Sequence, residues 1–264
     1  MLVSNGDVRI DVEVSGNGDD TVVLIHGFPL SREIWNAQVR ALSGHVRVVA
    51  MDLRGMGGSS VADGPYLMES LAGDVAAVLD ALAVERASLV GHSLGGYVAL
   101  AFTRMYVERL DRLALVCSRI TADSRDRAMH RRELADDAER RGSSDRIIAE
   151  MHDATLGETT RRERPEIGER FRKIAGKNDP RGLAAMLRGM SLRDGAQDIA
   201  GDLTMPVLVV AGAEDPGIPA GEAASVAAAF PAGKLVTLEG SGHVPMLEKP
   251  DDLSELLLGW ITSE

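Results

Sequence analysis

The stretch Ser88-Leu89-Val90-Gly91-His92-Ser93-Leu94-Gly95-Gly96 decides the fold of this chain. Its apolar start predicts a short strand, and residues 97–106 predict a helix directly after it. A Gly-x-Ser-x-Gly pattern at such a turn places the serine on a strained backbone with its hydroxyl exposed, and it requires small neighbours two positions away. Gly91 and Gly95 meet this requirement. The alternative is a glycine-rich turn whose serine merely caps a helix, so the rest of the chain has to decide.

Length and composition are those of an ordinary globular protein. The 264 residues suit one domain with room for an insertion, and 45% are hydrophobic and 26% charged. The net charge of −11 argues against a nucleic-acid-binding protein. Because only 3% of the residues are aromatic, stacking platforms for bases or sugars are not expected either.

Cysteine usage and the chain ends indicate the compartment. Cys117 is the single cysteine, so no internal disulfide is expected, and its apolar context predicts a buried small side chain. The first residues lack the basic start and apolar run of a secretory signal, and no stretch approaches the length that spans a bilayer. We therefore expect a soluble cytoplasmic protein that binds no membrane.

Strand and helix signals alternate along most of the chain. The turn signal Asn5-Gly6 predicts a hairpin within residues 1–14. Short apolar runs predict further strands at 21–25, 46–51, 87–90, 110–117, 205–211 and 234–238. Apolar residues at helical spacing predict helices at 32–42, 69–82, 97–106, 222–229 and 251–261. This alternation predicts a mostly parallel sheet with helices on both faces.

One block interrupts the alternation. Residues 119–201 are charged, show no clear strand pattern, and contain helix candidates at 125–141, 145–156, 166–175 and 181–190. We interpret this block as a helical insertion over one edge of the sheet. The predicted organisation is a core made of residues 1–118 and 202–264, with residues 119–201 as the insertion.

Polar residues follow the predicted strands at the edge where sites form in open parallel sheets. Ser93 follows the strand at 87–90, Asp215 the strand at 205–211, and His243 the strand at 234–238. A serine needs an imidazole to take its proton, and the imidazole needs an acid on its other nitrogen. The chain order serine, aspartate, histidine is the one that the serine turn predicts.

Other assignments for these polar groups remain open at this stage. Glu214 adjoins Asp215 and is a lesser candidate for the acid. Asp123 and Asp126 follow the strand at 110–117, and the acid of the relay can also come from that strand end. The alternative for Asp215 and His243 is that they are loop residues without a role in catalysis.

Four segments resemble the motifs of the α/β-hydrolases. They are His26-Gly27-Phe28-Pro29, which resembles the oxyanion loop; Asp52-Leu53-Arg54-Gly55-Met56-Gly57-Gly58-Ser59; Gly91 to Gly96, which resembles the nucleophile elbow; and Gly242-His243 with Pro245, Glu248 and Pro250. The resemblance implies a doubly wound eight-stranded sheet with a helical cap. It also implies the triad Ser93, Asp215 and His243, and an oxyanion hole made by the backbone N–H groups of Phe28 and Leu94.

The same resemblance assigns supporting roles. His26, Asp52 and Arg54 are expected to hold their loops, and His92 either shapes the pocket or has a structural role. Family members that act on haloalkanes or epoxides carry an aspartate at the elbow, and position 93 is a serine. Those two chemistries are therefore disfavoured.

The cap would set specificity. The candidates for pocket residues are His26, Trp35, His92, Met129, Met151, Met186, Met190 and Val244. Methionines suit an adaptable apolar pocket, although ordinary packing is the more common use of them. The cap arginines, such as Arg127 and Arg131, alternate with acids, which indicates a solvated helix face. A docking surface for an acidic partner such as an acyl carrier protein is the alternative.

These observations predict a serine hydrolase that cleaves a carboxylic ester or lactone of a small molecule through an acyl-enzyme, without a metal or organic cofactor. The same triad also serves cofactor-free perhydrolases, enol-lactone hydrolases and carbon–carbon bond hydrolases. A non-catalytic ligand receptor is the alternative from another class, and it is disfavoured because the elbow glycines and all three triad residues are present. The sequence leaves monomer and homodimer open.

Overall fold

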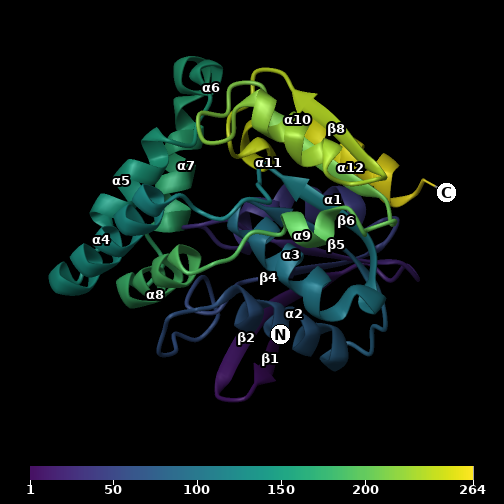
Figure 1. Cartoon of the computed structure of the whole chain (residues 1–264), viewed down its shortest axis with the longest axis horizontal. Coiled ribbons are helices and arrows are strands. Elements are labelled where there is room, and N and C mark those ends of the chain that lie inside the picture. Colours follow the sequence, from purple (N-terminus) through teal and green to yellow (C-terminus); the bar gives the residue numbers. More distant parts are fainter. Residues whose placement is uncertain (264) are drawn as a thin grey trace.

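The computed structural model describes residues 1–263, which contain one eight-stranded sheet with helices on both faces (Figure 1). The strands in spatial order are β1 (Leu2–Asn5), β2 (Val8–Ser15), β4 (Arg47–Met51), β3 (Thr21–Ile25), β5 (Ala87–His92), β6 (Leu110–Val116), β7 (Val207–Gly212) and β8 (Gly233–Leu238). β1 and β2 pair antiparallel, as do β2 and β4, and all other neighbours are parallel. The predicted mostly parallel sheet is confirmed.

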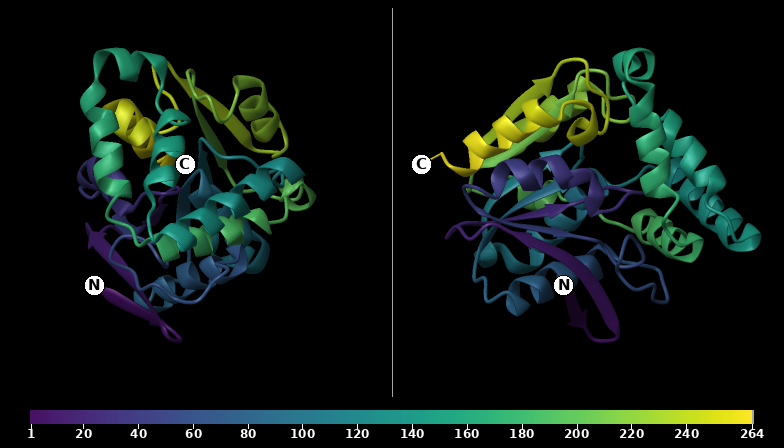
Figure 2. Two further views of the ribbon diagram at one scale, coloured as in Figure 1. Left: turned by 90° about the vertical axis from the view of Figure 1, so that its left-hand side faces the viewer. Right: turned by 180° about the vertical axis from the view of Figure 1, so that it is seen from behind.

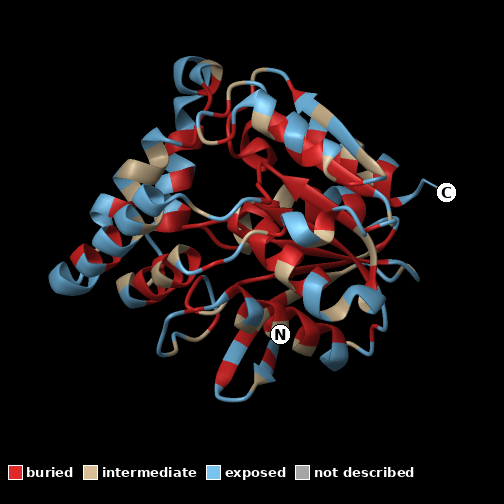
Figure 3. Ribbon diagram, viewed as in Figure 1, coloured by how far each residue is buried: buried red, intermediate tan, exposed pale blue. Residues whose placement is uncertain are grey.

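Helices bury both faces of this sheet. On one face lie α1 (Asn36–Leu42) and α12 (Pro250–Ile261), and on the other lie α2 (Met68–Ala81), α3 (Leu94–Tyr106) and α10 (Ala220–Ala228). Every residue of β3, β5 and β7 is therefore buried, and the central strands are red in Figure 3. Continuous apolar runs in these strands follow from this double cover, because neither face meets water.

Three local details differ from the sequence prediction. The hairpin loop is Gly6–Asp7, one residue later than the turn signal, because Asn5 still pairs with Val8. The helix predicted at 32–42 is divided into a 3-10 turn, η1 (Arg32–Trp35), followed by α1. The helix predicted from 97 begins at Leu94, because the chain enters it directly from the serine turn. A second 3-10 turn, η2 (Val107–Arg109), leads into β6.

The inserted region is helical throughout its ordered elements. It contains α4 (Arg125–Arg141), α5 (Asp145–Asp153), α6 (Glu158–Glu163), α7 (Pro165–Ala175) and α8 (Pro180–Ser191), and α9 (Gln197–Ala200) leads back to β7. Figures 1 and 2 show α4 to α8 as one group beside the sheet. The helix predicted at 145–156 ends at Asp153, and α6 was missed because its six residues contain no apolar side chain that would give a helical period. The limits 119 and 201 stay a prediction.

Apolar contacts attach this cap to both sides of the core. Leu134 of α4 and Leu183 of α8 belong to the same buried cluster as the residues of α2 and α3. Ile167 and Phe171 of α7 belong to the cluster formed by α1 and α12. The cap is therefore packed on the core at two places, one beside α2 and α3 and the other beside α1 and α12.

Two further expectations concern Cys117 and the membrane. Cys117 is buried, as its apolar context predicts. Each helix found within residues 1–263 is too short or too polar to cross a bilayer.

Candidate active site

Ser93 lies on the turn between β5 and α3. Its backbone has φ 50° and ψ −110°, a conformation that residues with a side chain rarely adopt. A Cβ at Gly95 would lie 2.2 Å from the carbonyl oxygen of Ile25, and a Cβ at Gly91 would lie 2.4 Å from the carbonyl oxygen of Gly95. Only glycine fits at both positions, so the two small residues of the pattern are required by the turn itself.

A hydrogen-bonded chain joins Ser93 to two later strand ends. The Ser93 hydroxyl lies 2.9 Å from Nε2 of His243, and Nδ1 of His243 lies 2.7 Å from Oδ2 of Asp215. Because the carboxylate accepts a hydrogen bond from the Nδ1–H group, Nε2 is left to accept a hydrogen bond from the serine hydroxyl. The structure thus brings together the three residues that the sequence proposes as a triad.

The surroundings of Asp215 keep its carboxyl group ionised. Burial by itself raises the pKa of Asp215, but the charge of His243 and its hydrogen bond outweigh burial and hold the pKa below its ordinary value. The backbone N–H groups of Gly217 and Ile218 contribute by donating to Oδ1 at 2.7 and 3.1 Å. A charged carboxylate therefore faces the imidazole near neutral pH.

The other candidates for the acid have different partners. Glu214 accepts hydrogen bonds from the backbone N–H and the hydroxyl of Thr159, at 2.7 and 2.6 Å. Asp123 lies between two arginines of the cap, and Asp126 is exposed on α4. Of the four candidates, only Asp215 is hydrogen-bonded to His243.

Two backbone N–H groups beside Ser93 are free to bind an oxyanion. Within the described residues, the N–H groups of Phe28 and Leu94 donate no hydrogen bond to another part of the chain. Leu94 is the first residue of α3, where the helix dipole favours negative charge. This arrangement is compatible with the predicted oxyanion hole, which stays a prediction.

His26 links the loop after β3 to the loop after β4. Its Nε2 accepts a hydrogen bond from the N–H of Leu53 at 3.0 Å, and its Nδ1 donates to the carbonyl oxygen of Gly27 at 3.0 Å. Burial lowers the pKa of His26 although Asp52 opposes this effect. His26 is therefore a neutral linker, as expected for a structural histidine.

Asp52 and Arg54 hold the second loop. The Asp52 carboxylate accepts from the N–H of Arg32 at 2.7 Å and from the N–H of Gly58 at 2.9 Å. Arg54 binds Asp74 of α2 through two hydrogen bonds of 2.7 and 2.6 Å. Both side chains stabilise the turn, in agreement with the expectation.

His92 supports the loop that carries His243 through one hydrogen bond. Its Nε2 donates to the carbonyl oxygen of His243 at 2.8 Å, while its Nδ1 has no hydrogen-bond partner and faces Gly27. Burial, together with the nearby charge of His243, lowers the pKa of His92 to about 3. The ring is therefore neutral and acts as a fixed donor to the backbone of residue 243.

A cavity of about 280 Å³ opens at Ser93. Its lining comes from the sheet edge and from the cap, and consists of Phe28, Ser93, Tyr97, Arg119, Arg127, His130, Arg131, Leu134, Glu150, Met151, Ala154, Leu187, Met190, Gly217, Ile218 and His243. Of the methionines that the sequence suggests, Met151 and Met190 lie on this wall.

The remaining pocket candidates do not line the cavity. Met129 is exposed on α4, because it points away from the core-facing side of that helix. Met186 is fully buried in the packing of α8 against the core. The other four candidates are buried and do not line the cavity: His26, Trp35, His92 and Val244.

The sequence interpretation missed the arginines of the cavity. Arg131 was expected on a solvated face, but its side chain is only 17% exposed and its Nε lies 2.5 Å from Asp123. Arg127 lies one turn earlier and also lines the cavity. The spacing of residues 127, 131 and 134 predicts that they share one side of a helix, but it does not predict whether that side faces the solvent or the cavity. Arg119 lies just after the carboxyl end of β6, where site residues gather in a parallel sheet, so its position in the sequence was a sufficient signal for it.

Cys117, Asp215 and His243 present ligand atoms within 4.8 Å of one another. The hydrogen bonds do not favour a metal ion, because both carboxylate oxygens of Asp215 already accept from Gly217, Ile218 and His243. Burial raises the pKa of the Cys117 thiol well above its usual range, and the neutral thiol points toward the carbonyl oxygen of Gly242 at 3.8 Å. The three groups fit an acid–base pair beside a neutral thiol.

Known proteins share the whole fold. A solved esterase from Thermogutta terrifontis, with malate bound, is 34% identical with a TM-score of 0.95, covering 99% of this chain and 97% of that one. A solved N-acyl homoserine lactone degrading enzyme is 26% identical with a TM-score of 0.83, covering 98% of this chain and all of the other. The pimeloyl-[acyl-carrier protein] methyl ester esterase of Aeromonas hydrophila is 29% identical over 255 residues, 95% of this chain and 98% of that protein.

The relatives differ in length. The chain spans from 65% to 98% of curated relatives that match more than nine tenths of it. A family model for the alpha/beta hydrolase fold matches residues 20–250. With its sheet order, its inserted helices and this match, the chain belongs to the α/β-hydrolase fold family and is esterase-like within it.

Proposed function

We propose that this protein is a serine hydrolase that cleaves a carboxylic ester or lactone of a small molecule. The observation that carries the proposal is the hydrogen-bonded chain from Ser93 through His243 to Asp215, with distances of 2.9 and 2.7 Å. A hydroxyl, an imidazole and an ionised carboxylate in this order form the relay that activates a serine nucleophile. Ser93 and His243 of this hydrogen-bonded series line a cavity large enough for a small substrate.

The reaction has two halves. Ser93 Oγ bonds to the substrate carbonyl carbon while its proton passes to Nε2 of His243, and the N–H groups of Phe28 and Leu94 stabilise the oxyanion. The carbon–oxygen bond of the ester then breaks, and His243 gives the proton to the leaving alcohol. Water, activated by His243, hydrolyses the acyl-enzyme and restores Ser93. In a lactone the leaving alcohol stays attached to the acyl group, and the chemistry is otherwise the same.

Asp215 has an electrostatic role throughout. Its carboxylate holds the Nδ1 proton of His243 and stabilises the imidazolium that forms in both halves. The names of the similar proteins support this choice of substrate class, since they include esterases and a lactone-degrading enzyme.

The test compares wild type with Ser93→Ala on short-chain p-nitrophenyl esters and simple lactones. We expect kcat to fall by about four orders of magnitude or more, because the nucleophile is removed. Ser225→Ala is the matched control, since Ser225 is exposed on α10 and remote from the cavity. A fluorophosphonate probe is expected to label wild type at Ser93 and to leave Ser93→Ala unlabelled.

The outcomes separate this proposal from its alternatives. Undiminished turnover by Ser93→Ala contradicts the mechanism. Peroxide-dependent halogenation of a dye that exceeds ester turnover favours a perhydrolase. Folded protein that neither reacts with the probe nor hydrolyses any ester favours a non-catalytic receptor.

A further inference from the structure

The cap side of the cavity carries positive charge in a protein whose net charge is −11. Arg127 and Arg131 lie four residues apart on α4, which places them on the same side of the helix. Both line the cavity onto which Ser93 and His243 open. Two guanidinium groups therefore face the same space as the nucleophile.

Two acidic residues at or near the cavity, Glu150 and Glu222, are paired with basic side chains other than Arg127 and Arg131. Glu150, which lines the cavity, binds Arg146 at 2.9 Å and His130 at 2.8 Å. Glu222 binds Arg119, whose Nη2 also donates to the carbonyl oxygen of Gly217 at 2.6 Å. Within each pair the opposite charges neutralise one another. Because Arg119 is bound in this way, we assign it a structural role in the wall of the cavity.

Asp123 is the remaining carboxylate, and it serves two arginines. Its Oδ1 lies 3.0 Å from Arg193, which also stacks on the ring of Tyr97, and its Oδ2 lies 2.5 Å from Nε of Arg131. One carboxylate compensates one of these two charges. Arg127 makes no side-chain hydrogen bond or ion pair within the described residues, so the arginines named here outnumber their carboxylate partners by two.

Arg131 lines the cavity, and part of its guanidinium group has no strong partner. Its Nε is bound by Asp123, and its Nη1 has only the weakly accepting sulfur of Met190, at 3.4 Å. No partner of Nη2 lies within the part of the chain that the structure describes. The side chain is 17% exposed, so water solvates this guanidinium poorly. A planar anion would satisfy its unused N–H groups.

We infer that the substrate of this site carries a carboxylate at the end opposite to the scissile ester or lactone, and that Arg131, assisted by Arg127, binds it. This inference rests on the proposed function and names its substrate class. The lining of the same cavity also includes apolar side chains, among them Leu134, Met151 and Leu187. Such a wall suits the methylene chain of a dicarboxylic acid half-ester, which is apolar in the middle and charged at one end.

The test uses a matched pair of substrates. Mono-p-nitrophenyl adipate carries a free carboxylate, and methyl p-nitrophenyl adipate has the same chain with that charge removed. Both release p-nitrophenol from the same acyl carbonyl. In wild type we expect kcat/KM for the half-ester to exceed that for the diester by about tenfold or more, which corresponds to one charged hydrogen-bonded contact. This ratio should fall as salt is added, because salt screens the attraction.

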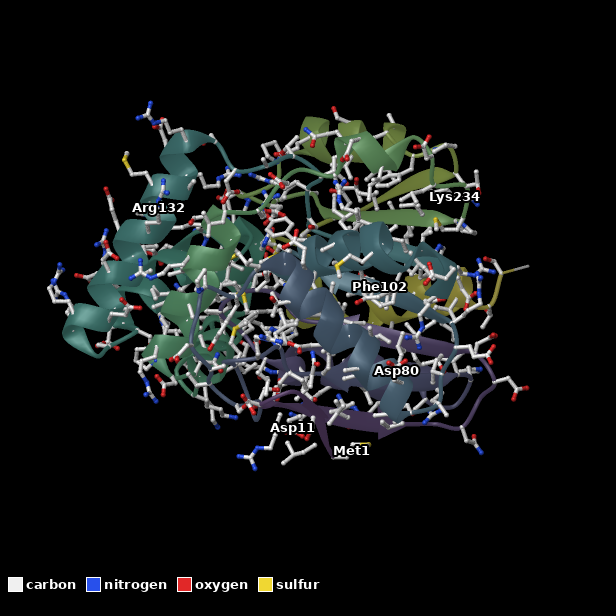
Figure 4. All side chains as sticks on the ribbon, turned by 60° about the horizontal axis from the view of Figure 1, so that its bottom comes forward. Met1, Asp11, Asp80, Phe102, Arg132 and Lys234 are labelled. Atoms are coloured by element: carbon white, nitrogen blue, oxygen red, sulfur yellow. The ribbon has the colours of Figure 1, made fainter. Side chains whose placement is uncertain are left out.

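Variants locate the effect. In Arg131→Gln the ratio of the two kcat/KM values is expected to fall by about tenfold, and in Arg127→Gln by a smaller factor, since Arg127 is more exposed. Arg127 has no structural partner, so this second variant keeps the test valid if Arg131→Gln folds poorly. Arg132→Gln is the control: Arg132 is exposed on the same helix (Figure 4), does not line the cavity, and should leave the ratio unchanged.

Failure of the inference and failure of the proposed function give different results. If both esters are hydrolysed in a Ser93-dependent way but the diester is the equal or better substrate, the carboxylate inference is wrong and the hydrolase proposal stands. If neither ester is hydrolysed, or if Ser93→Ala hydrolyses both undiminished, the proposed function fails and the inference fails with it. An equal loss of the ratio in Arg132→Gln also overturns the assignment to Arg131.

A further measurement identifies the acidic group. Adipate and inorganic phosphate are compared as inhibitors of diester hydrolysis, in wild type and in Arg131→Gln. We expect competitive inhibition by adipate at a lower concentration than by phosphate, and loss of that inhibition in the variant. The reverse order would assign the arginines to a phosphate group and overturn the choice of a carboxylate.

Discussion

The two walls of the cavity are built on different principles. On the sheet wall, Ser93, His243 and Asp215 form one hydrogen-bonded chain, and the buried His26 and His92 beside it are kept neutral. On the cap wall, guanidinium and carboxylate groups pair with one another, and the arginines outnumber the carboxylates by two. We propose that the first wall carries out the reaction and that the second selects the substrate.

This difference suggests separate roles for the two walls, catalysis for the sheet wall and substrate preference for the cap wall. We expect a change on the sheet wall to lower the turnover of every ester alike, and a change on the cap wall to alter the preference between esters. The substrate pair described above separates these two effects. Arg131→Gln tests the cap wall, and the following predictions test the sheet wall and the contact between the two.

The largest effect is expected for Asp215→Asn. An amide at this position donates to Nδ1 and so selects the wrong tautomer of His243, and the imidazolium loses its compensating charge. We expect kcat to fall by about 10⁴-fold for the half-ester and for the diester, with the ratio between them unchanged. Steady-state kinetics on both substrates measure this. A loss confined to one substrate would contradict the assignment of Asp215 to the sheet wall.

The second effect concerns stability at low pH and arises from His92. Its pKa is about 3 in the folded protein and 6.5 ordinarily, so below pH 6.5 the unfolded chain binds a proton that the folded chain does not. The free energy of unfolding therefore falls as the pH falls, by up to about 1.4 kcal/mol per pH unit from this residue. His26, whose pKa is also lowered, acts in the same direction.

His92→Asn tests this stability prediction, because an amide retains a donor but does not titrate. Urea unfolding of wild type and His92→Asn is compared between pH 6.5 and about pH 4.5. We expect the variant to lose about 2 kcal/mol less than wild type over this interval. His45→Asn, at an exposed position, is the control and should follow wild type. Parallel pH profiles for all three proteins would show that His92 is protonated in the folded state.

The smallest of these effects is expected where the two walls meet. The buried Glu248 carboxylate accepts hydrogen bonds from three backbone N–H groups. They belong to Gly157 in the cap and to Gly242 beside His243, both at 3.0 Å, and to Val244 at 3.1 Å. Glu248→Gln replaces one acceptor oxygen by a donor facing these N–H groups. We expect the free energy of unfolding to fall by about 1–2 kcal/mol.

Turnover should respond to the same change. Because Gly242 precedes His243, a looser loop is expected to lower kcat by about tenfold for both esters, with little change in KM. Glu255→Gln, an exposed substitution on α12, is the control for both readouts. A change in KM without a change in kcat would place Glu248 among the residues that bind substrate instead of those that position His243.

The sequence by itself determined the sheet and the place of the site. Apolar runs of five or six residues alternating with helical patterns require a parallel sheet, and parallel strands end at a common edge. The elbow glycines were readable because the turn at Ser93 leaves no room for a Cβ. From these facts it followed that Ser93, Asp215 and His243 lie near one another, although each comes from a different strand.

Only the tertiary structure decided which groups meet and which way the cap helices face. Glu214 and Asp215 are neighbours in sequence, yet one binds Thr159 of the cap and the other His243. Helical spacing put Arg127 and Arg131 on one face without saying whether that face meets water or the cavity. The orientation follows from the packing of α4 on α8 through contacts between residues distant in sequence. For this reason the hydrogen-bonded chain at Ser93 could be predicted from the sequence, and the arginines that line the cavity could not.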